Sequence, residues 1–181
     1  MDKKKLLDWD NPLPIFKWPI SVSREINAPV DQVWGAISRP GNLEDCHPFC
    51  DKNPVDVWPG PGAKDEIHYL SGWIMQRRFI KWIEGIGYDL EIGRPGGNQS
   101  FVSWRIKEVE EKQSILRISV YPHALQNLPV LVRWLPHHAY IKPQLRKYLQ
   151  SVTRGFEWYI INDEPVPRNH FGYHPWFSPK N

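Results

Sequence analysis

Apolar and polar residues alternate along most of the chain between residues 20 and 121. Ile20, Val22 and Ile26 alternate with polar residues, and the same two-residue period recurs in six later stretches. Turns rich in glycine and proline separate these stretches, as is typical of consecutive strands in an antiparallel sheet. The pattern predicts seven strands, at residues 20–26, 55–57, 67–69, 74–83, 88–92, 102–106 and 116–120.

Other segments have a helical period of three to four residues. Residues 30–37 are predicted to form a short amphipathic helix, with one further turn at residues 43–46. One or two helical turns are expected around Leu128, Leu131, Val132 and Leu135, and residues 141–160 predict a long amphipathic helix. Gly155 lies inside the long helix, where it either costs about 1 kcal/mol of helix propensity or allows a close approach to the sheet.

Both ends of the chain lack a regular period. Residues 1–19 mix charged residues, prolines and tryptophans, and residues 163–181 are rich in proline and aromatic residues. We interpret residues 1–19 as an extended arm, residues 20–162 as a single domain and residues 163–181 as a tail lying on the surface or on a partner. A homodimer held through these terminal arms is one arrangement that they allow.

Composition adds a heavy aromatic load to this pattern. Among 181 residues there are ten tryptophans, seven tyrosines and seven phenylalanines, enough both to fill a core and to line a cavity. The net charge of +3 comes from 23 basic and 20 acidic residues spread along the chain, so the sequence does not indicate nucleic-acid binding. No stretch resembles a transmembrane segment or a signal peptide, and we expect a cytoplasmic protein.

The order of the elements and several local motifs resemble one known superfamily. The stretch "INAPVDQVWGAIS" is followed by "RPGNL" and by His47-Pro48, and the series ends in an amphipathic helix. Over roughly residues 20–162 the chain resembles the SRPBCC superfamily, which includes START and birch-pollen-allergen-like proteins, and within it the polyketide cyclase/dehydrase group. The resemblance implies an α+β helix-grip fold, in which a curved seven-stranded antiparallel sheet wraps around the C-terminal helix and two short helices follow the first strand.

The resemblance also implies a cavity between the sheet and the long helix. In the leading interpretation this cavity binds a hydrophobic or aromatic small molecule, lipid-like or polyketide-like, without a cofactor. The alternative is a cyclase or dehydratase that orients its substrate in the same cavity and transfers protons through polar side chains. A third class is a protein that docks a partner through its terminal arms.

The stretch "DCHPFC" at residues 45–50 gathers both cysteines of the chain around a histidine. Structural zinc sites usually take four ligands from two such pairs, and the sequence lacks a second pair. The redox order C-x-x-C and the haem-attachment order C-x-x-C-H are also missing. We therefore expect a segment at the rim of the cavity that binds no metal, with His47 as its candidate ligand contact.

Candidate site residues come from the predicted strands and the long helix. With His47, the residues expected to shape the pocket are Trp82 (or Phe79 in its place), Tyr88, Trp104, Tyr148, Val152, Phe156 and Tyr159. The polar candidates for catalysis or ligand orientation are His68, Gln76 and Arg78, together with Glu66. Because residues 74–83 mix apolar and polar side chains in both alternating sets, the sequence leaves open which set faces the cavity.

Overall fold

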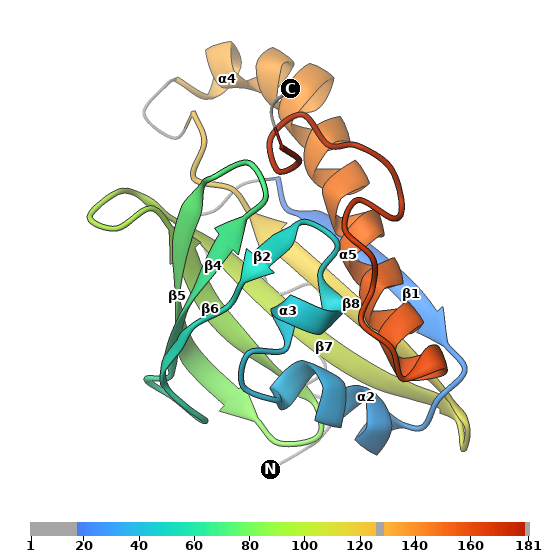
Figure 1. Ribbon diagram of the computed structural model, residues 1–181. Helices are drawn as coiled ribbons and strands as arrows, with labels where there is room; N and C mark the ends of the chain where they lie inside the picture. The colour runs from blue at the N-terminus through green and yellow to red at the C-terminus, as the bar shows by residue number, and fades with distance from the viewer. Residues whose placement is uncertain (1–17, 126–128, 180–181) are drawn as a thin grey trace.

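The strands form one antiparallel sheet that curls around a long helix (Figure 1). The computed structural model describes residues 18–125 and 129–179. Within them the strands are β1 Ile20–Ile26, β2 Cys50–Lys52, β3 Val55–Val57, β4 Lys64–Tyr69, β5 Ile74–Ile83, β6 Gly87–Gly93, β7 Gln99–Glu110 and β8 Gln113–Tyr121. Seven of these described strands follow one another in the order β1-β8-β7-β6-β5-β4-β2, and the short β3 also pairs with β4.

Two short helices follow β1, and the long helix closes the domain. The helices are α2 Val30–Ser38, α3 Leu43–Cys46, α4 Val130–Pro136, a π-helical turn η1 His137–Ile141, and α5 Lys142–Asn162. On its buried face α5 carries Leu149, Val152, Phe156 and Ile160, which join the core inside the curved sheet (Figure 1). The helix-grip fold expected from the sequence is confirmed.

A β-bulge decides which side chains of β5 face the interior. Before the bulge, Met75, Arg77 and Phe79 point inward. Between Phe79 and Lys81 the pairing with β6 shifts by one residue, and Trp82 then packs against the core. Each of the two alternating sets therefore faces inward over only part of the strand.

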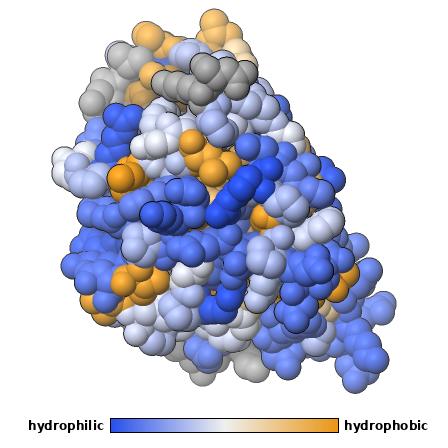
Figure 2. Space-filling view, in the orientation of Figure 1, coloured by the Kyte–Doolittle hydropathy of each residue, from blue (hydrophilic) through white to orange (hydrophobic). Residues whose placement is uncertain are grey.

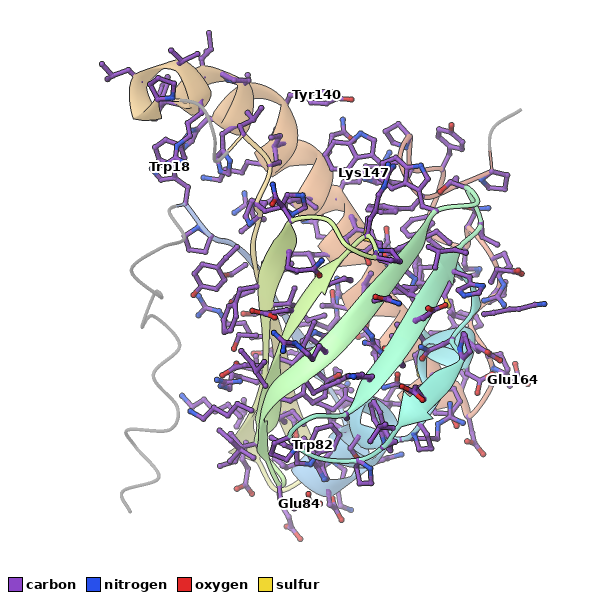
Figure 3. All side chains as sticks on the ribbon, turned by 90° about the vertical axis from the view of Figure 1, so that its left-hand side faces the viewer. Trp18, Trp82, Glu84, Tyr140, Lys147 and Glu164 are labelled. Carbon is purple, nitrogen blue, oxygen red and sulfur yellow. The ribbon has the colours of Figure 1, made fainter. Side chains whose placement is uncertain are left out.

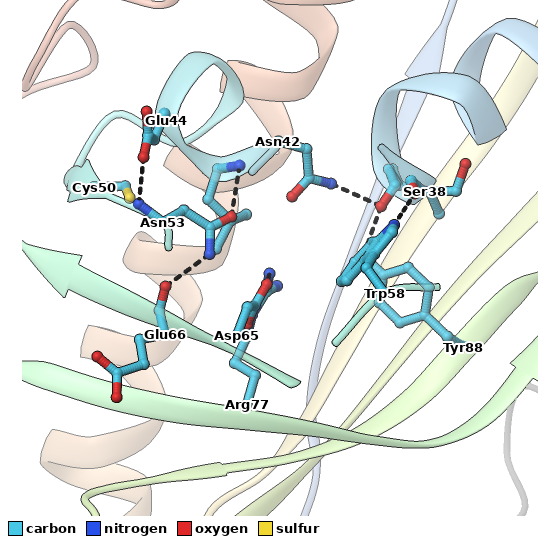
Figure 4. Close-up of polar contacts among 12 residues, drawn as sticks. Ser38, Asn42, Glu44, Cys50, Asn53, Trp58, Asp65, Glu66, Arg77 and Tyr88 are labelled. Atoms are coloured by element: carbon cyan, nitrogen blue, oxygen red, sulfur yellow. Dashed lines mark hydrogen bonds and ion pairs between the residues drawn. The ribbon is translucent and has the colours of Figure 1, made fainter. Parts of the chain in front are cut away.

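Five aromatic side chains fill one end of the core, next to α2. Ring centroids lie 4.9 Å apart for Trp58 and Phe79, 5.5 Å apart for Trp34 and Trp82, and 5.4 Å apart for Trp82 and Tyr88. The indole N–H of Trp58 and the hydroxyl of Tyr88 each donate to a backbone carbonyl of α2 (Figure 4). Because these two polar groups are already paired within the protein, neither needs a ligand as its hydrogen-bond partner.

Gly155 allows α5 to contact the segment that precedes β2. A Cβ atom at this position would lie 2.1 Å from the carbonyl oxygen of Cys46 and 3.0 Å from Cδ of Pro48. The close approach considered from the sequence is present, but its partner is this segment rather than the sheet. Residues 46–48 are thereby held directly against the middle of the long helix.

The tail after α5 runs back along that helix and passes over the same segment (Figure 1). The backbone N–H of Val166 donates to the carbonyl of Asp45 at 2.8 Å, and that of Asn169 donates to the carbonyl of Pro48 at 2.9 Å. Residues 163–179 therefore pack on their own domain.

Of the predicted N-terminal arm, residues 1–17 lie outside the described residues. The ring of Trp18 packs against His137 and His138, with centroids 5.2 and 5.3 Å apart. Within the described chain, no helix combines the length and the apolar character that a membrane crossing would require.

Candidate ligand-binding cavity

A cavity of about 620 Å³ lies between the sheet and α5. Tyr140 lines it, and Figure 3 shows this residue at the opposite end of the molecule from Trp82 of the aromatic cluster. Apolar side chains from the sheet and from α5 form much of the wall, among them Leu90, Val102 and Leu149. The volume falls within the range of roughly 300–1,000 Å³ that is typical of small-molecule sites.

Three polar side chains form a hydrogen-bonded chain in the cavity wall. Nε2 of His47 lies 2.8 Å from the hydroxyl of Tyr148, which lies 3.0 Å from the hydroxyl of Tyr69. The backbone N–H of Phe49 donates to Nδ1 of His47 at 3.1 Å, so Nδ1 is an acceptor. In the neutral imidazole the proton is then on Nε2, which donates to Tyr148. We call His47, Tyr148 and Tyr69 the hydroxyl chain.

The hydroxyl chain has three N–H or O–H protons but only two hydrogen bonds between its members. Tyr69 and Tyr148 share a single hydrogen bond, to which only one of their two hydroxyl protons can be donated. The other proton has no acceptor among the described residues, whichever tyrosine carries it. Both tyrosines line the cavity, so this spare proton is available to an acceptor on a bound molecule.

Burial keeps all three members of the hydroxyl chain uncharged. Desolvation, assisted by the positive charge of Arg77, lowers the pKa of His47 to about 3. Desolvation likewise raises the pKa of Tyr69 and of Tyr148 above the ordinary tyrosine value. At neutral pH the hydroxyl chain therefore offers a hydrogen-bond donor and no net charge.

A buried ion pair lies beside the hydroxyl chain. Arg77 lines the cavity, and its guanidinium forms two hydrogen bonds with the carboxylate of Asp65, one of them from Nε at 2.7 Å (Figure 4). Both side chains are buried. The paired geometry offsets the charge of each group, as a buried ion requires, so the pair gives this part of the cavity no net charge.

The tail supplies the aromatic cover of the hydroxyl chain. The ring of Phe177 lies 4.5 Å from that of Tyr69 and 4.3 Å from that of Tyr148, measured between centroids. The backbone N–H of Ser71, in the turn between β4 and β5, donates to the carbonyl of Phe177 at 3.1 Å. Phe177 and its neighbour Trp176 both line the cavity, so the tail is part of the site.

Half of the residues expected from the sequence to shape the pocket lie in the cavity wall: His47, Trp104, Tyr148 and Val152. They come from the segment before β2, from β7 and from one face of α5. The structure thus brings together, at one cavity, side chains that are about 100 residues apart, as in the pair His47 and Tyr148, separated by 101 positions.

The other four residues expected to shape the pocket do not line the cavity. Trp82 and Tyr88 belong to the aromatic cluster, and Phe156 packs on Trp104 with centroids 5.1 Å apart. Tyr159 lies near the end of α5, where the guanidinium of Arg39 stands 4.8 Å from its ring centroid. These four side chains support the fold around the cavity without lining it.

The polar candidates on β4 and β5 face away from the cavity. His68 and Gln76 both hydrogen bond to the carboxylate of Glu66, at 2.9 and 3.2 Å, and Arg78 forms an ion pair with Glu91. Strand alternation explains this placement, since the inward positions of these strands are taken by residues such as Ile67 and Arg77. The cavity wall therefore does not include His68, Gln76 or Arg78.

The "DCHPFC" segment reaches the cavity through its histidine. Burial raises the pKa of Cys46 and of Cys50 to about 12, and the thiol of Cys50 lies 3.2 Å from the carbonyl of Lys52. Among residues 18–125 and 129–179 no group of three or more His, Cys, Asp or Glu side chains is arranged to hold a metal ion. The cysteines are small buried core residues, and His47 is the member of the segment that lines the cavity.

The residues of the site that were not predicted from the sequence are Tyr69, Arg77, Asp65 and Phe177. A signal existed for Arg77, because it shares an alternating set with Met75 and Phe79. For the two tyrosines no local pattern could have shown that their hydroxyls meet, since they lie 79 positions apart.

The fold and this cavity define a helix-grip domain with a binding site between sheet and helix. The chain belongs to the family described as polyketide cyclase / dehydrase and lipid transport, whose model matches residues 17–157. This match confirms the superfamily resemblance seen in the sequence. No curated protein matches the sequence.

Solved structures share the fold at low sequence identity. A START superfamily protein from Mycobacterium smegmatis aligns with a TM-score of 0.63 and 9% identity, over 80% of this chain and 97% of that one. A norcoclaurine synthase from Thalictrum aligns at 0.58 and 14%, over 81% and 95%. DynU16, a putative protein of the dynemicin biosynthetic locus, aligns at 0.62 and 15%, over 81% of this chain and 48% of that one, so this chain spans about half of DynU16.

Proposed function

We propose that the protein binds an uncharged hydrophobic molecule, lipid-like or polyketide-like, and holds one of its oxygen atoms at the hydroxyl chain. The observation that carries this proposal is the spare hydroxyl proton of Tyr69 and Tyr148 within a largely apolar cavity. A buried hydroxyl needs an acceptor, and a carbonyl or hydroxyl oxygen of a ligand can supply it. Membership of a family described by polyketide cyclisation and lipid transport supports this class of ligand.

The charges around the hydroxyl chain favour an uncharged ligand. The guanidinium of Arg77 is already paired with Asp65, and His47 is neutral because burial lowers its pKa. A carboxylate or ammonium group placed here would lose its hydration without gaining an opposite charge. A ketone, ester or alcohol loses much less hydration and gains a hydrogen bond.

A matched pair of probes tests this hydrogen bond. Acetylnaphthalene and ethylnaphthalene differ by one carbonyl oxygen, and each can be measured by displacement of the dye N-phenylnaphthylamine from the full chain. Either tyrosine alone can still donate, so the informative variant is the double substitution Tyr69→Phe/Tyr148→Phe. We expect it to bind acetylnaphthalene roughly 2- to 12-fold more weakly, the value of one net hydrogen bond, and ethylnaphthalene as before.

Tyr88→Phe is the matched control for this experiment. It also removes a buried hydroxyl, but one that donates to the carbonyl of Ile37 outside the cavity. It should bind both probes as the natural chain does. Equal weakening of both probes in the double variant, or no uptake of any apolar probe by the natural chain, would contradict the proposal.

The same hydrogen bond favours an enzyme as the second candidate, of the cyclase or dehydratase type. A donor aimed at a ketone stabilises the negative charge that develops on its oxygen when a neighbouring C–H bond is broken. His47 is a weak base because burial lowers its pKa to about 3, so the arrangement supports polarising a carbonyl better than removing a proton. Faster exchange of the methyl protons of bound acetylnaphthalene with D₂O, followed by NMR and lost in the double variant, would support this candidate; an unaltered exchange rate would count against it.

A further inference from the structure

The short helix α4 exposes its apolar side chains to solvent. Leu131 is 91% exposed, Leu135 64%, Val132 58% and Trp134 52%. Figure 1 shows α4 beyond the ends of the strands, and Figure 2 shows hydrophobic side chains gathered at that end of the molecule. We call these four residues the α4 tip. Large apolar side chains grouped in this way on a surface mark a site of interaction.

The charge around the α4 tip identifies the kind of partner. From Lys112 to Phe156 the sequence contains no aspartate or glutamate. Directly after the tip, the first turns of α5 carry Lys142, Arg146 and Lys147, the last two of which are exposed. Apolar residues flanked by basic ones, in a stretch of sequence without acidic residues, complement a surface that is anionic outside and apolar beneath, which describes a bilayer containing acidic lipids.

The four apolar side chains of the α4 tip share one face of the helix. Residues 131, 132, 134 and 135 lie within an arc of about 160° around the helix axis, because successive residues are about 100° apart. A helix with one apolar face can lie in the plane of a lipid interface with that face buried below the headgroups. Trp134 suits the boundary between headgroups and acyl chains.

The α4 tip is followed directly in the chain by residues that line the cavity. Tyr140 and Ile141 follow the tip in η1, and both line the cavity, with Tyr140 also 54% exposed. Pro122 and Ala124, which lead from β8 toward α4, line it as well. The α4 tip therefore adjoins the part of the cavity wall that Tyr140 and Ile141 form.

We propose that the α4 tip inserts into the interfacial layer of an anionic lipid bilayer, with Lys142, Arg146 and Lys147 against the headgroups. Docking in this way needs no ligand in the cavity. The consequence that the ligand passes between cavity and bilayer rests in addition on the proposed function. The two statements can therefore fail separately.

Co-sedimentation of the full chain with vesicles tests the docking. Vesicles of phosphatidylcholine with phosphatidylserine should bind the natural chain more tightly than phosphatidylcholine alone. Leu131→Ser/Leu135→Ser should weaken binding to the acidic vesicles at least tenfold, because two exposed leucines would no longer enter the apolar layer. Lys142→Gln/Arg146→Gln should weaken it roughly fivefold for each charge removed, and only when phosphatidylserine is present.

The matched control is Ile80→Ser/Ile161→Ser, which changes two exposed apolar residues on β5 and at the end of α5. It should bind the vesicles as the natural chain does. The proposal is overturned if the natural chain binds neither kind of vesicle, or if the leucine variant binds as well as the natural chain. It is equally overturned if the natural chain binds no vesicles and instead self-associates through the tip, so that only the variant Leu131→Ser/Leu135→Ser is monomeric. Displacement of N-phenylnaphthylamine by acetylnaphthalene in the leucine variant, without vesicles, reports separately on the cavity.

Discussion

Acid should weaken the fold through the buried imidazole of His47. Burial, together with the charge of Arg77, lowers its pKa to about 3, whereas the same side chain in an unfolded chain takes up a proton near pH 6.5. Between these two values the unfolded state holds more protons than the folded state. The free energy of unfolding therefore falls as the pH falls through this window, and the contribution is fully present only above about pH 6.5.

The size of the effect follows from the two pKa values. Within the window each pH unit changes the free energy of unfolding by about 1.4 kcal/mol, so the loss from about pH 7 to about pH 4.5 is roughly 2–3 kcal/mol. That is a large part of the ~5–15 kcal/mol that stabilises an ordinary domain. Burial also lowers the pKa of His123, His137 and His174, and these groups add losses of the same sign.

Urea unfolding of the natural chain and of His47→Gln, at several pH values across this window, isolates the contribution of His47. The other histidines are common to both proteins, so their losses cancel in the difference. We expect the natural chain to lose roughly 2–3 kcal/mol more than the variant between about pH 7 and about pH 4.5. His170→Gln, which replaces an exposed imidazole, should follow the natural chain. If the free energy of unfolding changed with pH equally in the natural chain and in His47→Gln, the reasoning would be refuted. The imidazole in the folded protein would then accept a proton as readily as in the unfolded chain.

Three further predictions concern the packing around the cavity. Gly155→Ala should lower the free energy of urea unfolding by about 1–3 kcal/mol despite the better helix propensity of alanine, since its Cβ would meet the carbonyl of Cys46; unchanged stability would count against the close contact. Arg77→Met should cost about 3–5 kcal/mol in the same assay by leaving the Asp65 carboxylate buried and unpaired, and adding Asp65→Leu should recover much of that loss; a further loss on adding it would argue against the pair. The thiols of Cys46 and Cys50 should react with iodoacetamide at mildly alkaline pH only after unfolding, because burial raises the pKa of each to about 12; rapid labelling of the folded chain would disprove this.

The elements of the fold were predictable because each is encoded by a short-range pattern. Alternation at residues 20–26 and the step of three and four along residues 141–160 reflect which face of each element is buried, and burial is a local requirement. The inward face of β5 was not predictable in this way. A bulge between Phe79 and Lys81 exchanges the two alternating sets in the middle of the strand, and neither residue type signals a bulge.

The site was only partly predictable, because it depends on which half of the interior is filled. The size of Trp82 and Tyr88 suggested a pocket wall, yet together with Trp34 they fill the end beneath α2. Tyr148 was found because the long helix has a clear inner face. Its partner Tyr69 was not predicted, since a hydrogen bond between two hydroxyls produces no periodic pattern in the sequence.

The position of His47 depends on two features that looked unrelated in the sequence. Gly155 removes the side chain that would hold α5 away from Cys46 and Pro48, and the tail holds the same segment from outside through Asn169. Between them the imidazole has little freedom to turn, so Nε2 stays aimed at the cavity tyrosines. The tail lies beyond residue 157, where the match to the family model ends, and it also places Phe177 over both tyrosine rings. The shape of the cavity around the spare proton is therefore set in part by a segment that lies outside the match to the family model.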